Sequence, residues 1–251
     1  MVASCGELKG ARNVRQPRRC VKATSARSVA PIRHRSTIEW MSPDTDAGLV
    51  LVHADEALLV VEKPAGMLSV PGRGEAGKHN LTAQVQATCA DALGVHRLDM
   101  GTSGLMLFAR GASMQRALSM AFAAREVAKT YVALVEGHVG AESGQIDAAL
   151  RLDWPRRPRQ IVDNQHGKPS STRWHVLQRG PQTSRLQLHP ITGRSHQLRV
   201  HLQSIGHPIC GDELYGYEPL TAPRLMLHAT HLQFQHPGTG QVVAFSSQPA
   251  F

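Results

Sequence analysis

The sequence is poor in aromatic residues, and it contains no long apolar run. Aromatic side chains make up 4% of the 251 residues, so a core must be built from Leu, Val, Ile and Met. The most apolar stretches, residues 57–61 and 105–109, are far shorter than the roughly 18 residues that a membrane-spanning helix requires. These shortages argue against a membrane-spanning helix and predict a soluble protein with an aliphatic core.

Cysteine is equally scarce, and the signatures of several common enzyme classes are missing. The four cysteines, at positions 5, 20, 89 and 210, have neither metal-binding nor redox spacing, so we expect free thiols in a reducing compartment. The sequence has no GxxxxGKS/T, GxGxxG or GxSxG motif. Binding of nucleoside triphosphates or dinucleotides, and a nucleophilic serine elbow, are therefore without support.

The sequence also lacks an acidic excess, since its formal charge is +9. Nine of the 28 Lys and Arg residues, but only one of the 19 Asp and Glu residues, lie within residues 1–38. The other 213 residues carry 19 basic and 18 acidic side chains, so they are nearly neutral. An RNA-binding site in the folded part must therefore come from the arrangement of charges, because the bulk charge does not favour one.

Residues 1–45 have the composition of a disordered extension, because they are rich in Arg, Ser and Ala and show no apolar period. Three interpretations stay open. The segment is a basic arm that strengthens nonspecific RNA binding, an organellar transit peptide, or the result of a start codon placed too early, with Met41 as the true start. Under all three, we expect the folded domain to occupy residues 46–251.

The folded part combines short strand patterns with a few helical ones. Apolar runs predict strands at 49–53, 57–61, 104–109, 129–135, 225–234 and 242–245, and further strands and loops between 141 and 190. Helical patterns predict helices at 81–90, 111–127 and 195–205, the last with Leu198, Leu202 and Ile205 facing the core. Strands outnumber helices without regular βαβ alternation. We therefore predict an α+β fold with a mixed, largely antiparallel sheet and flanking helices.

The first candidate site is the segment HRLDMGTSG at residues 96–104. Asp99 stands just before a glycine-rich turn that leads into a buried strand, so rigid backbone would hold its carboxylate at the mouth of a core element. A nucleophilic or basic carboxylate needs such a setting. Taken alone, however, the local pattern is more typical of a turn aspartate that caps backbone amides.

The second candidate site is the segment GRSHQLRVH at residues 193–201. Ser195 is a candidate for the helix N-cap. His196 and Arg199 are three positions apart and are predicted to share one helix face. The helix N-terminus with Arg194 and Arg199 would form a site for a phosphate or a carboxylate. An ordinary polar helix face is the alternative.

Together, four segments in this order resemble the RluA family of pseudouridine synthases. They are VVEKPAGM at 60–67, HRLDMGTSG at 96–104, KTYVA at 129–133, and GRSHQLRVH at 193–201 followed by GHPICGD at 206–212. The resemblance runs from about Leu49 to the C-terminus. It departs from the family pattern at Gly101, where the substitution is small and leaves the motif intact.

Finer matches point to the bacterial RluA-type branch. LSVPGR at 68–73, DWPRRP at 153–158, GKP at 167–169 and APRLMLHA at 222–229 are similar to segments of that branch. Its enzymes modify a uridine in the tRNA anticodon stem-loop and one in a hairpin of large-subunit (23S) rRNA. The resemblance therefore implies structured RNA as the partner, a cytoplasmic enzyme and no cofactor. We expect a monomer that does not contact a membrane.

The resemblance also implies roles for individual residues. Asp99 would be the nucleophile or base that acts at the ribose, held ionised beside Arg199. Tyr131 would stack on the base and move a proton, and Arg97 would fill the gap left by the flipped nucleotide. The remaining assignments are RNA contacts from His96, Arg194 and His196, and pocket walls from Leu98 and Leu227.

Three alternatives remain open. One is a catalytically silent RNA-binding or chaperone protein on the same fold, although intact catalytic residues argue against it. Another is a metal-dependent hydrolase built on His189, His196 and His201, whose spacing matches no standard ligand signature. We therefore predict no metal site. The third keeps the synthase chemistry but restricts the substrate to rRNA or to tRNA.

Overall fold

The computed structural model describes residues 49–251. The basic segment 1–45, with its three interpretations, lies outside the described residues. Within residues 49–251, no helix is both long and apolar enough to cross a membrane.

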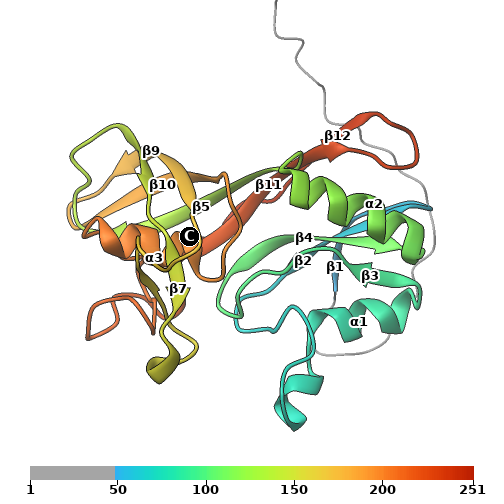
Figure 1. The fold of residues 1–251 in the computed structure, drawn as a ribbon, viewed down its shortest axis with the longest axis horizontal. Helices are drawn as coiled ribbons and strands as arrows, with labels where there is room; N and C mark the ends of the chain where they lie inside the picture. The colour runs from blue at the N-terminus through green and yellow to red at the C-terminus, as the bar shows by residue number, and fades with distance from the viewer. Residues whose placement is uncertain (1–48) are drawn as a thin grey trace, which may run out of the picture. The chain divides into compact units, whose positions relative to one another are not determined.

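A ten-stranded sheet forms the frame of the domain (Figure 1), and a two-stranded ribbon of β7 and β8 accompanies it. The strand order along the sheet is β1-β2-β4-β11-β5-β10-β9-β6, with β12 paired to β11 and β3 paired to β4. The strands are β1 (Val50–Ala54), β2 (Leu58–Lys63), β3 (Ala92–Gly94), β4 (Ser103–Arg110), β5 (Ala128–Glu136), β6 (Ser143–Asp147), β7 (Leu150–Leu152), β8 (Gln160–Val162), β9 (Ser171–Arg179), β10 (Thr183–Pro190), β11 (Leu227–Gln235) and β12 (Val242–Ser246).

Few helices accompany the strands. They are α1 (Leu81–Thr88), α2 (Gly111–Ala124) and α3 (Gln197–Ser204), with short 3-10 turns η1 (Glu75–Lys78) and η2 (Trp154–Arg156). All but one of the strand pairs in the described region are antiparallel. The predicted α+β class and the predicted helices are therefore confirmed.

The strands β2 and β4 are buried on both faces, which explains their continuous apolar sequence. Alternate residues of a strand point to opposite faces. On one face, Leu58 and Val60 pack against Leu118 of α2. On the other face, Leu59 and Val61 pack in the cluster that holds Leu81 and Val85 of α1. In Figure 1 the two helices accordingly lie on opposite sides of these strands.

The two halves of the sheet join where β4 and β11 pair in parallel. Ser103 lies opposite His228, and Gly104 lies opposite Ala229. Gly104 has a φ of +111°, and a Cβ atom there would lie 2.3 Å from the carbonyl oxygen of Ala229. Only glycine satisfies both the backbone conformation and the close approach. Gly104, which lies a few positions after the Asp99 turn, therefore has a fixed place at the centre of the sheet.

Helix α3 covers the other half of the sheet. Leu198 and Leu202 pack against Leu186 and Leu188 of β10. The predicted inward position of Ile205 is wrong: the residue follows the end of the helix and is 37% exposed. The N-cap prediction for Ser195 is also wrong. His196 occupies that position in the left-handed conformation, with a φ of 54° and no side-chain cap.

Candidate active site

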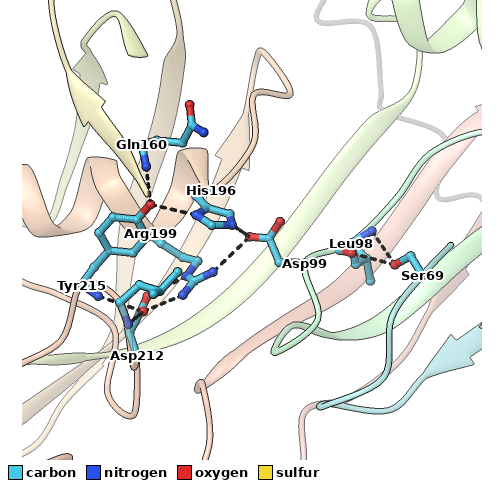
Figure 2. Close-up of polar contacts among 9 residues, drawn as sticks. Ser69, Leu98, Asp99, Gln160, His196, Arg199, Asp212 and Tyr215 are labelled. Carbon is cyan, nitrogen blue, oxygen red and sulfur yellow. Dashed lines mark hydrogen bonds and ion pairs between the residues drawn. The ribbon is translucent and has the colours of Figure 1, made fainter. Parts of the chain in front are cut away.

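Asp99 lies in the loop between β3 and β4, and the backbone on both sides of it is anchored. The buried hydroxyl of Ser69 donates to the carbonyl oxygen of Leu98 at 2.7 Å and accepts from its amide at 3.0 Å (Figure 2). On the other side, Lys63 Nζ and the amide of Gly66 donate to the carbonyl oxygen of Met100, at 3.0 and 2.9 Å. The carboxylate is thereby held on a fixed stretch of chain.

Lys63 is fully buried and has three backbone acceptors. Its Nζ donates to the carbonyl oxygens of Pro64, Met67 and Met100, at 2.7, 2.7 and 3.0 Å. Burial lowers the pKa of Lys63 to about 8, against the opposing effect of the Asp99 carboxylate. Lys63 therefore ties the Asp99 loop to the end of β2 and adds positive charge beneath it at neutral pH.

Arg199 reaches Asp99 from α3 on the opposite side of the cavity. Its Nε and one terminal nitrogen bind the buried Asp212 carboxylate at 2.8 and 2.7 Å, and its other terminal nitrogen lies 3.5 Å from Asp99 Oδ2 (Figure 2). Burial disfavours the guanidinium charge, but the hydrogen bond and charge of Asp212, with a further effect of Asp99, raise the pKa of Arg199. The arginine therefore stays charged and is aimed by Asp212.

His196 and Tyr215 form a second arm toward Asp99. The Tyr215 hydroxyl accepts from the amide of Gln160 at 2.7 Å and lies 2.8 Å from His196 Nδ1. His196 Nε2 is 4.0 Å from Asp99 Oδ2 (Figure 2). Burial lowers the pKa of His196, while Asp99 acts in the opposite direction and Arg199 lowers it further. A neutral ring with its proton on Nε2 would direct that proton to the carboxylate.

These groups open into a cavity of about 770 Å³. Leu98 and Leu227, which are 5% and 3% exposed, line it, as does Tyr131 of β5. Burial raises the pKa of Tyr131, and the negative charge of Asp99 raises it further. The phenol therefore keeps its proton near neutral pH. A cavity of this size, with apolar walls and one carboxylate, can accept a planar nucleobase with its ribose.

The charges around the cavity are strongly one-sided. Asp99 is the one acidic residue among the described residues that line it. The basic residues that line it, by contrast, are Arg97, Arg125, Lys129, Arg173, Arg194 and Arg199. A near-neutral domain thus concentrates positive charge around this cavity, which favours a polyanionic ligand.

Comparison with known proteins identifies the chain. A sequence profile described as RNA pseudouridylate synthase matches residues 57–204, which include Asp99, Tyr131 and Arg199. The chain belongs to this family. The predicted family and enzyme class are therefore confirmed. Membership of this family replaces the hypothesis of a metal-dependent hydrolase.

Similar proteins support the assignment over most of the chain. A "dual-specificity RNA pseudouridine synthase RluA" of Salmonella typhi is 45% identical over 211 residues, covering 83% of this chain and 96% of the relative. The protein of the same description from Escherichia coli K12 is 42% identical over 217 residues, covering 85% and 99%. The solved structure of human RNA pseudouridylate synthase domain containing 1 has a TM-score of 0.70 at 29% identity and covers 84% of this chain and 87% of that one.

The synthase brings all nine of its predicted site residues to one cavity. Each of them lies along its lining, although sequence separates the first from the last by 131 positions: His96, Arg97, Leu98, Asp99, Tyr131, Arg194, His196, Arg199 and Leu227. Of the two guanidinium groups predicted for the anion site, Arg199 faces the Asp99 carboxylate, whereas Arg194 donates to the Pro169 carbonyl oxygen at 3.4 Å. Asp99 does not act as a backbone cap: in the described region its carboxylate contacts His196 and Arg199.

His96 has a structural contact as well as a place in the cavity lining. Its Nε2 accepts a hydrogen bond from the Leu107 amide at 2.9 Å. Its ring stacks on that of Phe122, with 4.8 Å between the ring centroids. Burial lowers the pKa of His96 to about 3, and the charge of Lys129 contributes to the shift. A charged contact from His96 to RNA is therefore disfavoured at neutral pH. A contact through the neutral ring stays a prediction.

The other two histidines of the metal hypothesis have separate neighbours. His201 is buried between the hydroxyl groups of Ser170 and Thr172, both at 2.9 Å. His189 Nε2 lies 3.1 Å from the side-chain oxygen of Gln187. Within residues 49–251, no three His, Cys, Asp or Glu side chains are grouped as metal ligands.

The residues that support the site from behind were not among the predicted site residues. Asp212 and Tyr215 hold Arg199 and His196, and Ser69 and Lys63 hold the Asp99 loop. Asp212 is the last residue of the segment GHPICGD. The resemblance therefore included Asp212 but did not indicate that it binds Arg199. The partnership of Ser69 with Leu98 spans 29 positions and leaves no local signal.

Proposed function

We propose that this synthase converts one specific uridine in a tRNA anticodon stem-loop, and one in a hairpin of 23S rRNA, into pseudouridine. The description of its bacterial relatives as dual-specificity enzymes supports two RNA substrates. The observation that carries the proposal is the single carboxylate that lines the cavity among residues 49–251, Asp99, faced by Arg199 at 3.5 Å beneath a basic rim.

The reaction is an isomerisation. The bond between N1 of uracil and C1′ of ribose breaks, the base rotates, and a bond forms between C5 and C1′. C5 loses a proton and N1 gains one, so that atoms and electrons balance without an oxidant. The protein must supply a group that acts at the ribose, a surface that holds the free base and a route for the proton.

In this proposal Asp99 acts at the ribose as nucleophile or base. The nearby guanidinium of Arg199 favours the ionised carboxylate, which is the reactive form. Because Asp212 fixes Arg199, and the Ser69 and Lys63 contacts fix the Asp99 loop, little reorganisation is needed when the substrate arrives.

Tyr131 stacks on the base and delivers or accepts the proton through its hydroxyl. The raised pKa of Tyr131 supports a protonated phenol as the resting form. Leu98 and Leu227 confine the rotating base between them. Arg97 fills the space that the flipped nucleotide leaves in the RNA, at a cost of a few kcal/mol that is smallest in a loop.

The basic rim binds the RNA backbone around the target. Arg194 belongs to it, the neutral ring of His196 contacts the RNA beside it, and the unanticipated Arg125, Lys129 and Arg173 extend it across the opening. Recognition of a folded loop rests on shape and stacking more than on a linear code. We further propose that residues 46–251 form the catalytic domain and that the enzyme acts as a cytoplasmic monomer. Organellar targeting by residues 1–45 is the alternative location.

The proposal is tested by incubating the purified full-length protein with a tRNA anticodon stem-loop and, separately, with a 23S rRNA fragment. Pseudouridine is mapped by carbodiimide labelling for wild type, Asp99→Asn and Asp147→Asn. Asp147 is an exposed aspartate of β6 outside the cavity lining, so its variant controls for loss of a carboxylate as such.

We expect wild type and Asp147→Asn to label one uridine in each RNA, and Asp99→Asn to label none. Labelling in only one RNA would restrict the enzyme to that substrate. If wild type bound both RNAs and modified neither, the silent RNA-binding protein would replace the synthase as the best account of this chain.

A further inference from the structure

The loop between β7 and β8 presents an unusually exposed aromatic side chain. Trp154, at the start of η2, is 65% exposed, although the chain has only three tryptophans and Trp174 is buried. The guanidinium carbon of Arg157 lies 4.4 Å from the Trp154 ring centroid. A large aromatic surface kept in water next to a cation is typical of a binding site.

The exposure of Trp154 is imposed by a well-connected loop. Asp153 is 6% exposed, and it accepts from Arg156 Nε at 2.6 Å. The backbone closes two turns, with Arg156 N donating to Asp153 O and Arg159 N donating to Arg156 O, both at 3.1 Å. Arg159 also donates to the Leu214 carbonyl oxygen and lies over the Tyr215 ring at 5.9 Å. The indole therefore points outward from a fixed support.

The same loop is attached to the catalytic cavity. Gln160, the first residue of β8, donates its amide to the Tyr215 hydroxyl, which in turn contacts His196 beside Asp99 (Figure 2). In Figure 1 the loop that follows β7 projects away from the sheet on the side of α3. Trp154 thus stands outside the cavity lining, and the other end of its loop, at Gln160, is linked to His196 through two hydrogen bonds.

The chemistry of the loop fits an RNA base. Residues 153–160 carry three arginines and one aspartate, and Arg156 and Arg157 are exposed. An indole surface binds any base by stacking, and adjacent guanidinium groups bind the phosphate that accompanies it. An apolar protein segment is a less suitable ligand, because it would leave the excess positive charge of this loop without a partner.

We propose that Trp154 and Arg157 form a second nucleotide subsite, which stacks an unpaired base of the RNA substrate outside the catalytic cavity. The inference rests on the proposed function, because it requires RNA as the ligand. It adds a contact that selects RNAs with an unpaired base at the correct distance from the target uridine. Trp154 contributes to substrate binding and does not touch the reacting atoms.

The test uses full-length protein and the anticodon stem-loop RNA, with Trp154→Ala, Trp154→Phe and Met120→Ala. Met120 lies on α2 and is also 65% exposed, so its variant controls for removal of an exposed apolar side chain. Loss of one stacked base corresponds to an increase of about 5- to 150-fold in KM. We expect that increase in Trp154→Ala, with kcat within about threefold of wild type and an unchanged Tm. Trp154→Phe should recover most of the affinity, and Met120→Ala should behave as wild type.

A spectroscopic measurement separates stacking from support of the fold. RNA should quench the tryptophan fluorescence of wild type, and this quenching should disappear in Trp154→Phe while RNA binding persists. An unchanged KM in Trp154→Ala, or quenching that persists in Trp154→Phe, would overturn the subsite. A lowered Tm with equal losses in both Trp154 variants would show a packing role and would also overturn it.

Failure of the subsite is distinguishable from failure of the proposed function. If wild type forms pseudouridine and Trp154→Ala matches its KM, the subsite is wrong and the enzyme assignment stands. If wild type forms none, the proposed function fails. The dissociation constant and the fluorescence quenching, measured with the same RNA, then decide the subsite by the same criteria.

Discussion

At the scale of single residues, Arg199 connects the Asp99 carboxylate to the buried interior. It binds Asp212, which is 1% exposed, through two hydrogen bonds and directs its remaining nitrogen to Asp99. A buried charge that loses its partner is strongly unfavourable, whereas an exposed pair contributes little. Arg199 therefore stabilises the fold through Asp212 and also faces Asp99. A single substitution of Arg199 removes both contributions.

Arg199→Gln is expected to lower the free energy of unfolding by about 3–5 kcal/mol, because it leaves Asp212 without its counter-ion. The measurement is urea unfolding at neutral pH. Arg151→Gln is the matched control, since Arg151 pairs with Asp163 at the surface and its loss should change stability by less than about 1 kcal/mol. An equal change in the free energy of unfolding in the two variants would show that the Arg199–Asp212 pair stabilises the protein no more than a surface ion pair does.

His96 makes a pH-dependent contribution to stability. Its pKa is about 3 in the fold and 6.5 in the unfolded chain, so between these values the unfolded chain binds more protons. The contribution is therefore complete above about pH 6.5, and it is lost as the pH falls toward 3. The slope of the free energy of unfolding is up to about 1.4 kcal/mol per pH unit.

His96→Gln keeps an acceptor for the Leu107 amide but removes the titrating ring. We expect the variant to lose part of the wild-type decline in stability between pH 6 and pH 4, measured by urea unfolding at several pH values. The exposed His138→Gln serves as control and should retain that decline. Parallel pH profiles for wild type and His96→Gln would contradict a half-buried, neutral ring at position 96.

Single-residue predictability depended on whether a residue belongs to a compact motif. Asp99 and Arg199 stand in short patterned segments, so their candidacy was visible in the sequence. Tyr215 gave no such signal, because its hydroxyl links Gln160 and His196, which are 55 and 19 positions away. Partners brought together only by the fold leave no local pattern.

At the scale of elements, the junction between β4 and β11 fixes the relation between the Asp99 loop and the rest of the sheet. Gly104 allows the two backbones to approach, and a Cβ atom there would meet the Ala229 backbone at 2.3 Å. The clash is with backbone, which cannot move aside without separating the strands. The substitution therefore combines overpacking with an unfavourable φ.

Gly104→Ala is accordingly expected to destabilise the domain by about 3 kcal/mol or more. Thermal unfolding followed by circular dichroism measures the change. Gly140→Ala is the control, because a Cβ at Gly140 has no neighbour within 4 Å and the residue has no positive φ. A Gly104→Ala variant as stable as Gly140→Ala would contradict the tight parallel junction.

Elements with a strong apolar pattern were predictable, and their connections were not. Burial on both faces made β2 and β4 continuous apolar runs, which a sequence pattern detects. The parallel pairing of Ser103 with His228 joins residues 125 positions apart and has no counterpart in the sequence pattern. The start of α3 was misplaced because Ser195 is a favoured cap by residue type, whereas His196 adopts the cap position with a left-handed backbone.

At the scale of the whole molecule, the distribution of charge distinguishes the candidate active site from the rest of the domain. The 213 residues after the basic tail are nearly neutral, yet six cationic side chains and one carboxylate line the cavity among the residues that the structure describes. The near-neutral composition predicted that RNA binding would require such an arrangement, but no sequence pattern placed Arg125, Lys129 and Arg173. Their convergence depends on the sheet order.

The central claim is that Asp99 performs the chemistry of uridine isomerisation. The most direct measurement is the release of tritium from C5 of uridine in an anticodon stem-loop RNA, for wild type and Asp99→Asn, with the dissociation constant of each measured on the same RNA. We predict steady tritium release by wild type, and a loss of at least about 10⁴-fold in Asp99→Asn at similar affinity. Comparable release by both proteins would contradict the account.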